Sequence, residues 1–287
     1  MFKLQKSSMR FGNIVIYLIL GLGGIMMIIP FIWMLSISFD LKAVATVPFP
    51  PTLLPGEFTF QNYTGAIRSL HLGRIYSNTF IVTGGVIIIS LTSAFMSGYA
   101  ISKIKFRGAH IILIMCLATM MVPLESTLIP LFMLFNKLGM INSYAAFYLP
   151  AASYAFGTFL VKQYMDTLPD SLREAAIIDG AGDYTIFLRI FLPLSKTLIA
   201  TLVILQFLAN WNNLLWPLIV LNDPAKFTIQ IGLALFKSSV GEVGVSGNPF
   251  PGITMAGTVL SVIPVLLVYI FLQKYIVQSI ALSGIKQ

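Results

Sequence analysis

The chain has 287 residues, of which 57% are hydrophobic and only 10% are charged. Soluble domains carry about 25% charged residues, so this composition argues against a water-soluble globular protein. The formal net charge of +8 would suggest a nucleic-acid partner on a soluble protein. We expect no such partner, because membrane topology accounts for the basic residues.

Six long apolar runs follow one another along the chain, and the only carboxylate within them is Glu125. Each reaches or exceeds the length of about 20 apolar residues that crosses a bilayer. Helices are expected, because backbone polar groups in lipid must be satisfied within the segment. The sequence therefore predicts an all-α polytopic membrane protein, a single transmembrane domain over 1–287. Its six spans would be 11–39, 75–102, 108–136, 138–161, 197–222 and 254–277.

The basic residues predict the orientation of these spans. With both termini in the cytoplasm, twelve of the 18 Lys and Arg residues lie on the cytoplasmic side. This bias agrees with the positive-inside rule for membrane proteins. The chain has one cysteine, Cys116, which excludes an internal disulfide and a cysteine-based metal cluster. We expect no metal site.

A polar stretch, LPDSLREAAIIDGAGDYTIFLRIFLPLSK, interrupts the apolar pattern between the fourth and fifth runs. Half of the chain's ten carboxylates lie between Asp166 and Asp183, and the predicted topology places the loop 163–195 in the cytoplasm. Ser171 and Glu174 have the spacing of a capping box, which predicts a short helix. Glycines would end that helix, and a second would follow toward Pro193. A plain pair of interfacial helices is the alternative interpretation.

The residues EAAIIDGAGDYTIFLRIFLPL resemble the EAA loop of ABC-importer permeases. The matching positions are Glu174, Ala175, Ala176, Gly180, Ile190, Leu192 and Pro193. The stretches MVPLESTLIPLFMLFNKLGMINSYAA, WNNLLWPLIV and FTIQIGLALF are similar to the carbohydrate-uptake branch, MalG-type permeases in particular. The glycerol-phosphate permease of that branch is similar too. The resemblance covers the chain from about residue 48 to its end.

The resemblance implies a permease subunit of an ATP-driven sugar importer that works by alternating access. Its EAA helix would dock on a cytoplasmic ATPase, with a carboxylate meeting a basic residue and two alanines giving a close fit. The coupling residues so implied are Glu174, Ala175, Ala176, Asp179, Gly180 and Gly182. Implied partners are a second related permease, two ATPase subunits and an extracytoplasmic sugar-binding protein. The outer loops 40–74 and 222–253 are the candidates for contact with that binding protein.

The chain lacks a nucleotide-binding motif of its own. No G-x-x-x-x-G-K-[ST] sequence occurs, so no phosphate-binding loop is visible. We therefore expect a transport subunit without cofactor rather than an enzyme, with ATP and Mg²⁺ bound by the partner ATPase.

Polar residues within the apolar runs are candidates for the solute pathway. An intramembrane carboxylate is a functional candidate by default. Amides can bind sugar hydroxyls, and an indole can cover sugar C–H surfaces. Hydrogen bonding between helices is the structural alternative for these residues. The candidates are Glu125, Gln206, Asn210, Trp211, Asn212 and Asn78.

A stand-alone secondary transporter or channel is the second functional hypothesis. That class usually carries broken helices or paired intramembrane charges in matched halves of the chain. The sequence shows one lone glutamate and no matched halves, which favours the permease subunit.

Overall fold

The computed structural model describes residues 11–44, 52–239 and 251–284. Within these ranges the chain is helical, and the one β-bridge joins Asp40 to Phe58. The contacts divide the chain into two compact units. Unit 1 comprises Met1–His71 with Leu235–Ser261, and unit 2 comprises Leu72–Ala234 with Val262–Gln287.

Unit 1 begins with α1 (Phe11–Ser38), followed by η1 (Leu41–Val44) and α2 (Gln61–Ser69). Asp40 organises the segment between them. Its carboxylate accepts hydrogen bonds from the backbone N–H groups of Gly56 and Lys42, each at 2.9 Å, and its carbonyl accepts one from Asn62. The predicted outer loop 40–74 therefore contains ordered structure, although its residues 45–51 lie outside the described part.

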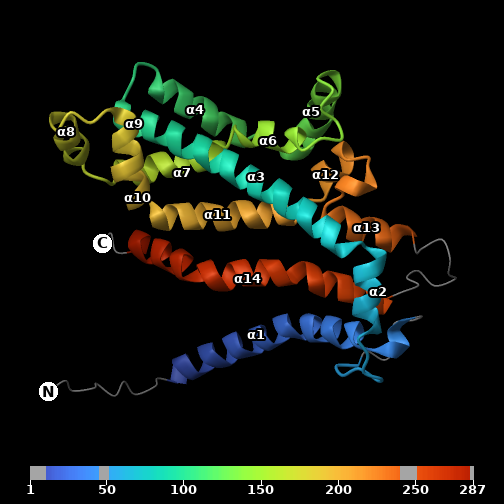
Figure 1. Ribbon diagram of the computed structural model, residues 1–287. Helices are drawn as coiled ribbons and strands as arrows, with labels where there is room; N and C mark the ends of the chain where they lie inside the picture. Colours follow the sequence, from blue (N-terminus) through green and yellow to red (C-terminus); the bar gives the residue numbers. More distant parts are fainter. Residues whose placement is uncertain (1–10, 45–51, 240–250, 285–287) are drawn as a thin grey trace. The chain divides into compact units, whose positions relative to one another are not determined.

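Unit 2 is built around α3 (Leu72–Tyr99), which continues into the π-helical turn η2 (Ala100–Ile104). The helices α7 (Ala155–Asp166) and α11 (Lys196–Trp211) pack along α3 (Figure 1). Helix α4 (Ala109–Met120) in turn packs against α7. Small residues allow these close approaches, as is usual for helices in membranes.

The remaining helices of unit 2 are short or bent. They include α5 (Leu124–Lys137), α6 (Ala145–Ala151) and α12 (Leu215–Val220), and the 3₁₀ turn η4 (Pro224–Lys226) precedes α13 (Ile229–Ser239). Both α13 and α14 (Pro251–Gly284) contribute residues to both units. The predicted outer loop 222–253 is thus partly helical, and its residues 240–250 lie outside the described part.

Among the described residues, three uninterrupted helices are long and apolar enough to cross a membrane, at 13–38, 72–104 and 251–274. Two bent pairs raise the number to five if each counts as one span. One pair is α4 with α5, bent by 106°, and the other joins 183–194 to α11 with a bend of 78°. The all-helical, multi-pass prediction is confirmed for the described residues, whereas the number of six spans stays a prediction.

Three predicted spans are not continuous helices. The run 197–222 is divided into α11 and α12, separated by residues 212–214. The run 108–136 bends at Pro123, which is extended and disfavours helical geometry in the residue before it. The run 138–161 is divided into α6 and α7, separated by residues 152–154. None of the three interruptions is marked by a run of charged residues, so the charge pattern alone predicts continuous spans there.

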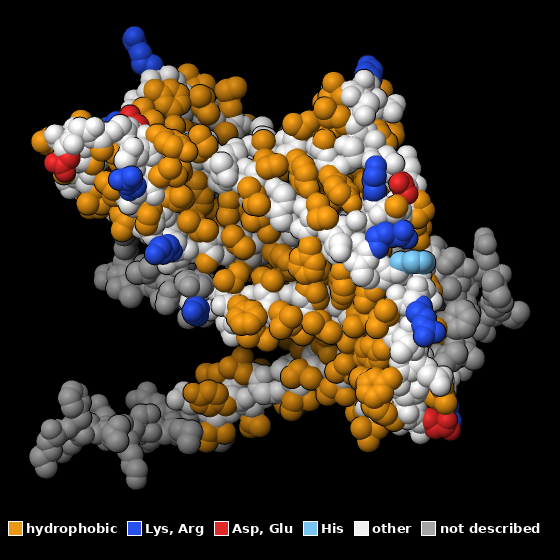
Figure 2. Space-filling model, viewed as in Figure 1, with side chains coloured by type: hydrophobic (Ala, Val, Ile, Leu, Met, Phe, Trp, Pro, Cys, Tyr) orange, Lys and Arg blue, Asp and Glu red, His pale blue; other side chains and the backbone are white. Residues whose placement is uncertain are grey.

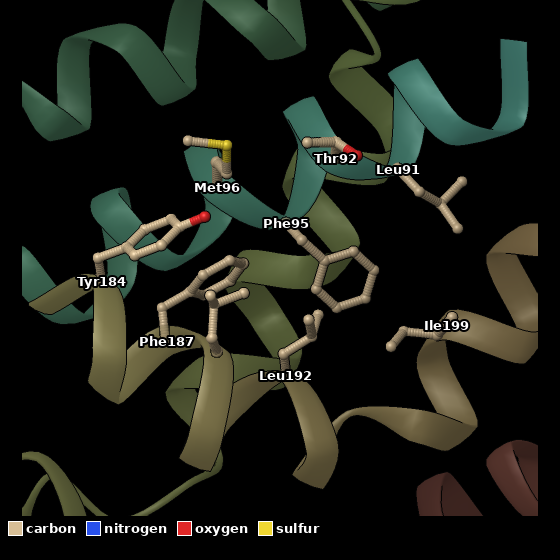
Figure 3. Close-up of a pocket in the computed structure, with 9 residues that line it drawn as sticks. Leu91, Thr92, Phe95, Met96, Tyr184, Phe187, Leu192 and Ile199 are labelled. Carbon is tan, nitrogen blue, oxygen red and sulfur yellow. The ribbon is translucent and has the colours of Figure 1, made fainter. Parts of the chain in front are cut away.

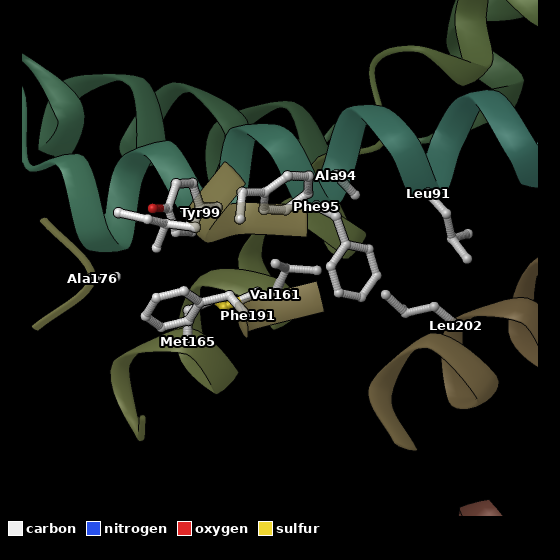
Figure 4. Packing of buried hydrophobic residues seen from close by; sticks show 11 residues of the cluster. Leu91, Ala94, Phe95, Tyr99, Val161, Met165, Ala176, Phe191 and Leu202 are labelled. Atoms are coloured by element: carbon white, nitrogen blue, oxygen red, sulfur yellow. The ribbon is translucent and has the colours of Figure 1, made fainter. Parts of the chain in front are cut away.

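A buried apolar cluster joins the spans of unit 2 to the polar loop (Figure 4). Phe95 and Tyr99 of α3 meet Val161 and Met165 of α7 within it. Phe191 from the polar loop is fully buried in the same cluster, and its ring centre lies 5.3 Å from that of Tyr99. The loop is therefore packed against the helix bundle rather than suspended from it.

Charged side chains gather at the two ends of unit 2 (Figure 2). One group lies around α8 (Ser171–Ile178), and the other lies near α5 and α12. The surface between them is largely apolar in this view. This distribution matches a segment that spans lipid with a hydrophilic face on each side.

Candidate functional site

The polar loop, residues 163–195, contains two short helices, α8 and α9 (Asp183–Ile186). They are followed by the π-turn η3 (Phe187–Phe191) and α10 (Leu192–Leu194). The expected capping box is absent. Asp170 rather than Ser171 precedes the first helical residue, and no side chain caps the helix. The Asp170 carboxylate instead contacts the ammonium groups of Lys103 and Lys105 at 2.6 and 2.7 Å. Two charge-assisted contacts hold this carboxylate more strongly than a backbone N–H would.

Gly180 ends α8, as the sequence predicted. Its φ of +80° lies in the left-handed region, which favours glycine. The N–H of Ala181 bonds to the carbonyl of Ala176, and the N–H of Gly180 bonds to that of Ile177, both at 2.9 Å. This is the Schellman pattern for the end of a helix. Gly182 has extended geometry and precedes α9.

An ion pair closes the turn between α8 and α9, residues 179–182, which we call the elbow. Asp183 accepts hydrogen bonds from Nε and Nη2 of Arg173 at 3.1 and 2.8 Å. The bonds from Asp183 raise the pKa of the Arg173 guanidinium above its ordinary value, against the opposing effect of burial. Arg173 therefore stabilises the internal geometry of the loop.

The outward face of α8 is exposed and has few internal contacts. The side chains of Glu174 and Asp179 form no hydrogen bond or ion pair within the described residues, and Ala175 is exposed beside them. The Ile178 side chain is 86% exposed. Ala176, by contrast, is buried in the apolar cluster, so it anchors α8 to its own chain. Of the two predicted alanines, only Ala175 is open to a partner.

An apolar pocket of about 230 Å³ lies between α3, the loop and α11 (Figure 3). Phe95, Leu192 and Ile199 line it together with residues of η3, and the only side-chain hydroxyls are those of Thr92 and Tyr184. A sugar needs many hydrogen-bonding partners, so this pocket does not suit one.

A larger pocket of about 740 Å³ is lined by apolar residues together with several polar side chains, and we call it the polar pocket. It lies where two helices are interrupted: α6 and α7 separate around Tyr154, and α11 and α12 separate around Asn213. Interrupted helices at membrane depth are tolerated where they line a cavity. The polar side chains that line it are Ser153, Tyr154, Gln206, Asn210, Asn212 and Asn213.

The structure brings three of the predicted pathway residues together in this pocket, namely Gln206, Asn210 and Asn212. The Asn210 amide donates to the Gln206 side-chain oxygen at 2.8 Å, which fixes the two side chains relative to each other. Sequence reasoning missed Ser153 and Tyr154, because they come from a helix interruption within an apolar run.

The other three predicted pathway residues lie elsewhere. Trp211 is fully buried, stacked on Phe207 with ring centres 5.2 Å apart. The Asn78 amide donates to the carbonyls of Ala225 and Phe227 at 2.8 and 3.0 Å. Glu125 is exposed in the first turn of α5 and is not among the residues that line the polar pocket.

The sequence model of one protein family matches residues 87–282. That family is described as the binding-protein-dependent transport system inner membrane component. The chain belongs to this family. The matched region of this permease component contains the polar loop and most of the residues that line the polar pocket.

Curated relatives of this permease component are similar over most of its length. The arabinooligosaccharide transport permease AraQ of Halalkalibacterium halodurans is 36% identical, with 74% of this chain and 73% of the relative aligned. The sn-glycerol-3-phosphate permease UgpE of Brucella abortus is 34% identical, with 93% and 95% aligned. The diacetylchitobiose uptake permease NgcG of Streptomyces coelicolor is 31% identical, with 96% and 89% aligned.

A solved structure is similar in fold. It is the crystal structure of a bacterial ABC transporter involved in the import of the acidic polysaccharide alginate. The TM-score is 0.82 at 27% identity, and the match covers 93% of this permease component and 96% of that chain. The all-helical arrangement is therefore that of an ABC importer.

Proposed function

We propose that this chain is a membrane-spanning subunit of an ATP-driven importer for carbohydrates or glycerol derivatives. It forms half of the translocation pathway and works by alternating access between two sides of the membrane. The single observation that carries the proposal is the family match over residues 87–282, together with relatives whose names include arabinooligosaccharide, glycerol phosphate and diacetylchitobiose transport.

The polar pocket supplies the contacts for a solute rich in hydroxyls. Gln206, Asn210 and Asn212 offer amide donors and acceptors, and Tyr154 adds an aromatic ring with a hydroxyl group. In secondary transporters, solute sites are commonly formed by interrupted helices near the middle of the membrane. A pocket at two such interruptions supports a role for these residues in the pathway.

The exposed face of α8 is the proposed contact with the ATPase. Glu174 and Asp179 have no internal ion pair within the described residues, and Ala175 and Ile178 provide an apolar surface beside them. Charge complementarity would fix the register of the contact, and the apolar residues would supply buried area. Gly180 and Gly182 shape the elbow on which this face is presented.

The assembly that we propose contains this chain, a second related permease, two cytoplasmic ATPase subunits and an extracytoplasmic sugar-binding protein. The ATPase subunits bind ATP and Mg²⁺, whereas this chain binds no cofactor. Both termini lie in the cytoplasm of a cell whose plasma or inner membrane holds the complex. The basic residues around the polar loop support this orientation.

Reconstitution tests the proposal. The chain is purified together with its partner permease, ATPase and binding protein, and uptake of candidate sugars and glycerol phosphate into proteoliposomes is measured with and without ATP. The proposal predicts ATP-dependent uptake that requires the binding protein. Glu174→Lys should uncouple ATP hydrolysis from uptake while the complex still assembles. ATP-independent uptake by the chain alone would favour the stand-alone transporter or channel.

A further inference from the structure

Lys103 is a buried cation at the end of α3, in the π-turn η2. Its side chain is only 2% exposed, although the residue lies in a stretch of basic sequence. The ammonium group donates to the carbonyl of Leu168 at 2.7 Å and to the carboxylate of Asp170 at 2.6 Å. It also lies 5.6 Å from the centre of the Phe191 ring, which is within the range of a cation–π contact.

These contacts join α3 to both sides of α8. Leu168 and Asp170 directly precede α8, and Phe191 follows α9 in the turn η3. One ammonium group therefore holds the two segments that flank the elbow. The elbow itself is closed separately by the pair between Arg173 and Asp183, so α8 and α9 are tied to each other and to α3.

Further polar contacts reinforce the attachment of α8 to the end of α3. Lys105 contacts the other oxygen of Asp170 at 2.7 Å, and the hydroxyl of Ser102 donates to Asp166 at 2.6 Å. Asp166 in turn pairs with Lys162 at 2.6 Å. All of these partners come from the end of α3, the end of α7 or the segment before α8. We call the contacts of Lys103 with Leu168, Asp170 and Phe191 the Lys103 junction.

We propose that Lys103 is a positioning residue for transport, through which a movement of α8 is transmitted to α3. The inference rests on the proposed function, because it assumes that α8 receives force from an ATPase. Separating a buried cation from its carboxylate leaves an unpaired charge in an apolar environment, which is strongly unfavourable. The junction therefore favours motion of α8 and α3 as one body.

Helix α3 leads from the junction to the polar pocket. At a rise of about 1.5 Å per residue, its 28 residues span roughly 40 Å. Val86, near its middle, lines the polar pocket, and Asn78, near its start, is bonded to the carbonyls that precede α13. A displacement of the Lys103 end would thus reach a wall of the pocket through one continuous helix.

The test compares variants in the complete transporter reconstituted in proteoliposomes. The readout is the amount of solute taken up per ATP hydrolysed, at equal amounts of assembled complex. Lys103→Met should lower this ratio at least tenfold while ATP hydrolysis continues. Lys103→Arg should restore much of it, because the charge and its hydrogen bonds are kept. Lys196→Met, which removes an exposed lysine from the start of α11, serves as the matched control and should leave the ratio unchanged.

Asp170→Asn decides the question if Lys103→Met does not assemble. The neutral amide keeps one acceptor but loses the charge, so the ratio should fall several-fold. When both variants assemble, the double variant should be no worse than Lys103→Met alone, as expected for two residues of one interaction.

An unchanged ratio in Lys103→Met, or in Asp170→Asn when it alone assembles, overturns the role of the junction. If wild-type protein shows no ATP-driven uptake, the proposed function itself fails. If Glu174→Lys uncouples while the junction variants do not, only this inference fails.

Discussion

Gly98 of α3 lies so close to Val161 of α7 that a Cβ atom at position 98 would come within 2.6 Å of the valine Cγ1. The backbone nitrogen of Lys162 would be only 3.0 Å away. Neither neighbour is the free end of a flexible side chain. The polar loop packs against α3 and α7. The contact between these two helices therefore depends on the absence of a side chain at Gly98.

Gly98→Ala should destabilise the protein by about 1–3 kcal/mol, the usual cost of overpacking a core. Gly84→Ala in the same helix is the matched control, because nothing lies within 4 Å of a Cβ atom there. Thermal unfolding in detergent, followed by the loss of monodisperse protein, measures the difference. Equal midpoints for the two variants would show that α3 and α7 are not packed as described.

Removing an amide from the polar pocket should weaken solute transport. Gln206→Ala removes the side-chain acceptor of the Asn210 amide and leaves only the bond to the Gln206 backbone carbonyl, and a hydrogen bond contributes about 0.5–1.5 kcal/mol. We expect the uptake rate at subsaturating solute to fall about three- to tenfold in proteoliposomes. Glu125→Gln, a polar substitution outside the pocket, should have less effect than Gln206→Ala. The reverse order would place the pathway elsewhere.

The junction between α8 and α3 should not respond to pH in the physiological range. Hydrogen bonds from Lys103 and Lys105 lower the pKa of Asp170 to about 2. A carboxylate with a lowered pKa stabilises the folded state above its unfolded pKa and loses that effect only as the pH falls toward 2. The ratio of uptake in Asp170→Asn to that in wild-type protein should therefore stay constant from about pH 5 to pH 8. A ratio that rises toward one at pH 5 would contradict the ion pairs.

Gly180→Ala should destabilise the elbow together with the two short helices that flank it. A left-handed backbone costs a residue with a Cβ atom roughly 1 kcal/mol. Hydrogen exchange over residues 171–186 should accelerate about fivefold. Gly182→Ala is the control, because Gly182 has a negative φ and open space around it. The same acceleration in both variants would argue against the Schellman geometry.

The elements that depend on neighbouring residues were predictable from the sequence. The end of α8 at Gly180 follows from the conformational freedom of glycine, and the apolar runs follow from the absence of charge. The polar residues near Asn210 were recognisable because amide side chains are conspicuous in an apolar run. These signals need no knowledge of distant parts of the chain.

The contacts that depend on folding were not predictable. Lys103 and Asp170 are 67 residues apart, and no local pattern indicates that the carboxylate would bind two lysines rather than cap its own helix. The different environments of Ala175 and Ala176 depend on how α8 packs against the apolar cluster. Tyr154 reaches the polar pocket only because the predicted fourth span is interrupted, and alanine, serine and tyrosine give no strong signal for an interruption.

The most direct test of the central claim uses the single native cysteine. In a Cys116→Ser background, Ile178→Cys places one thiol on the exposed face of α8. Labelling with a membrane-impermeant maleimide is measured in intact cells and in inside-out vesicles, with and without bound ATPase. The account predicts labelling from the cytoplasmic side alone, and protection when the ATPase is bound. Labelling in intact cells, or equal labelling with and without the ATPase, would contradict it.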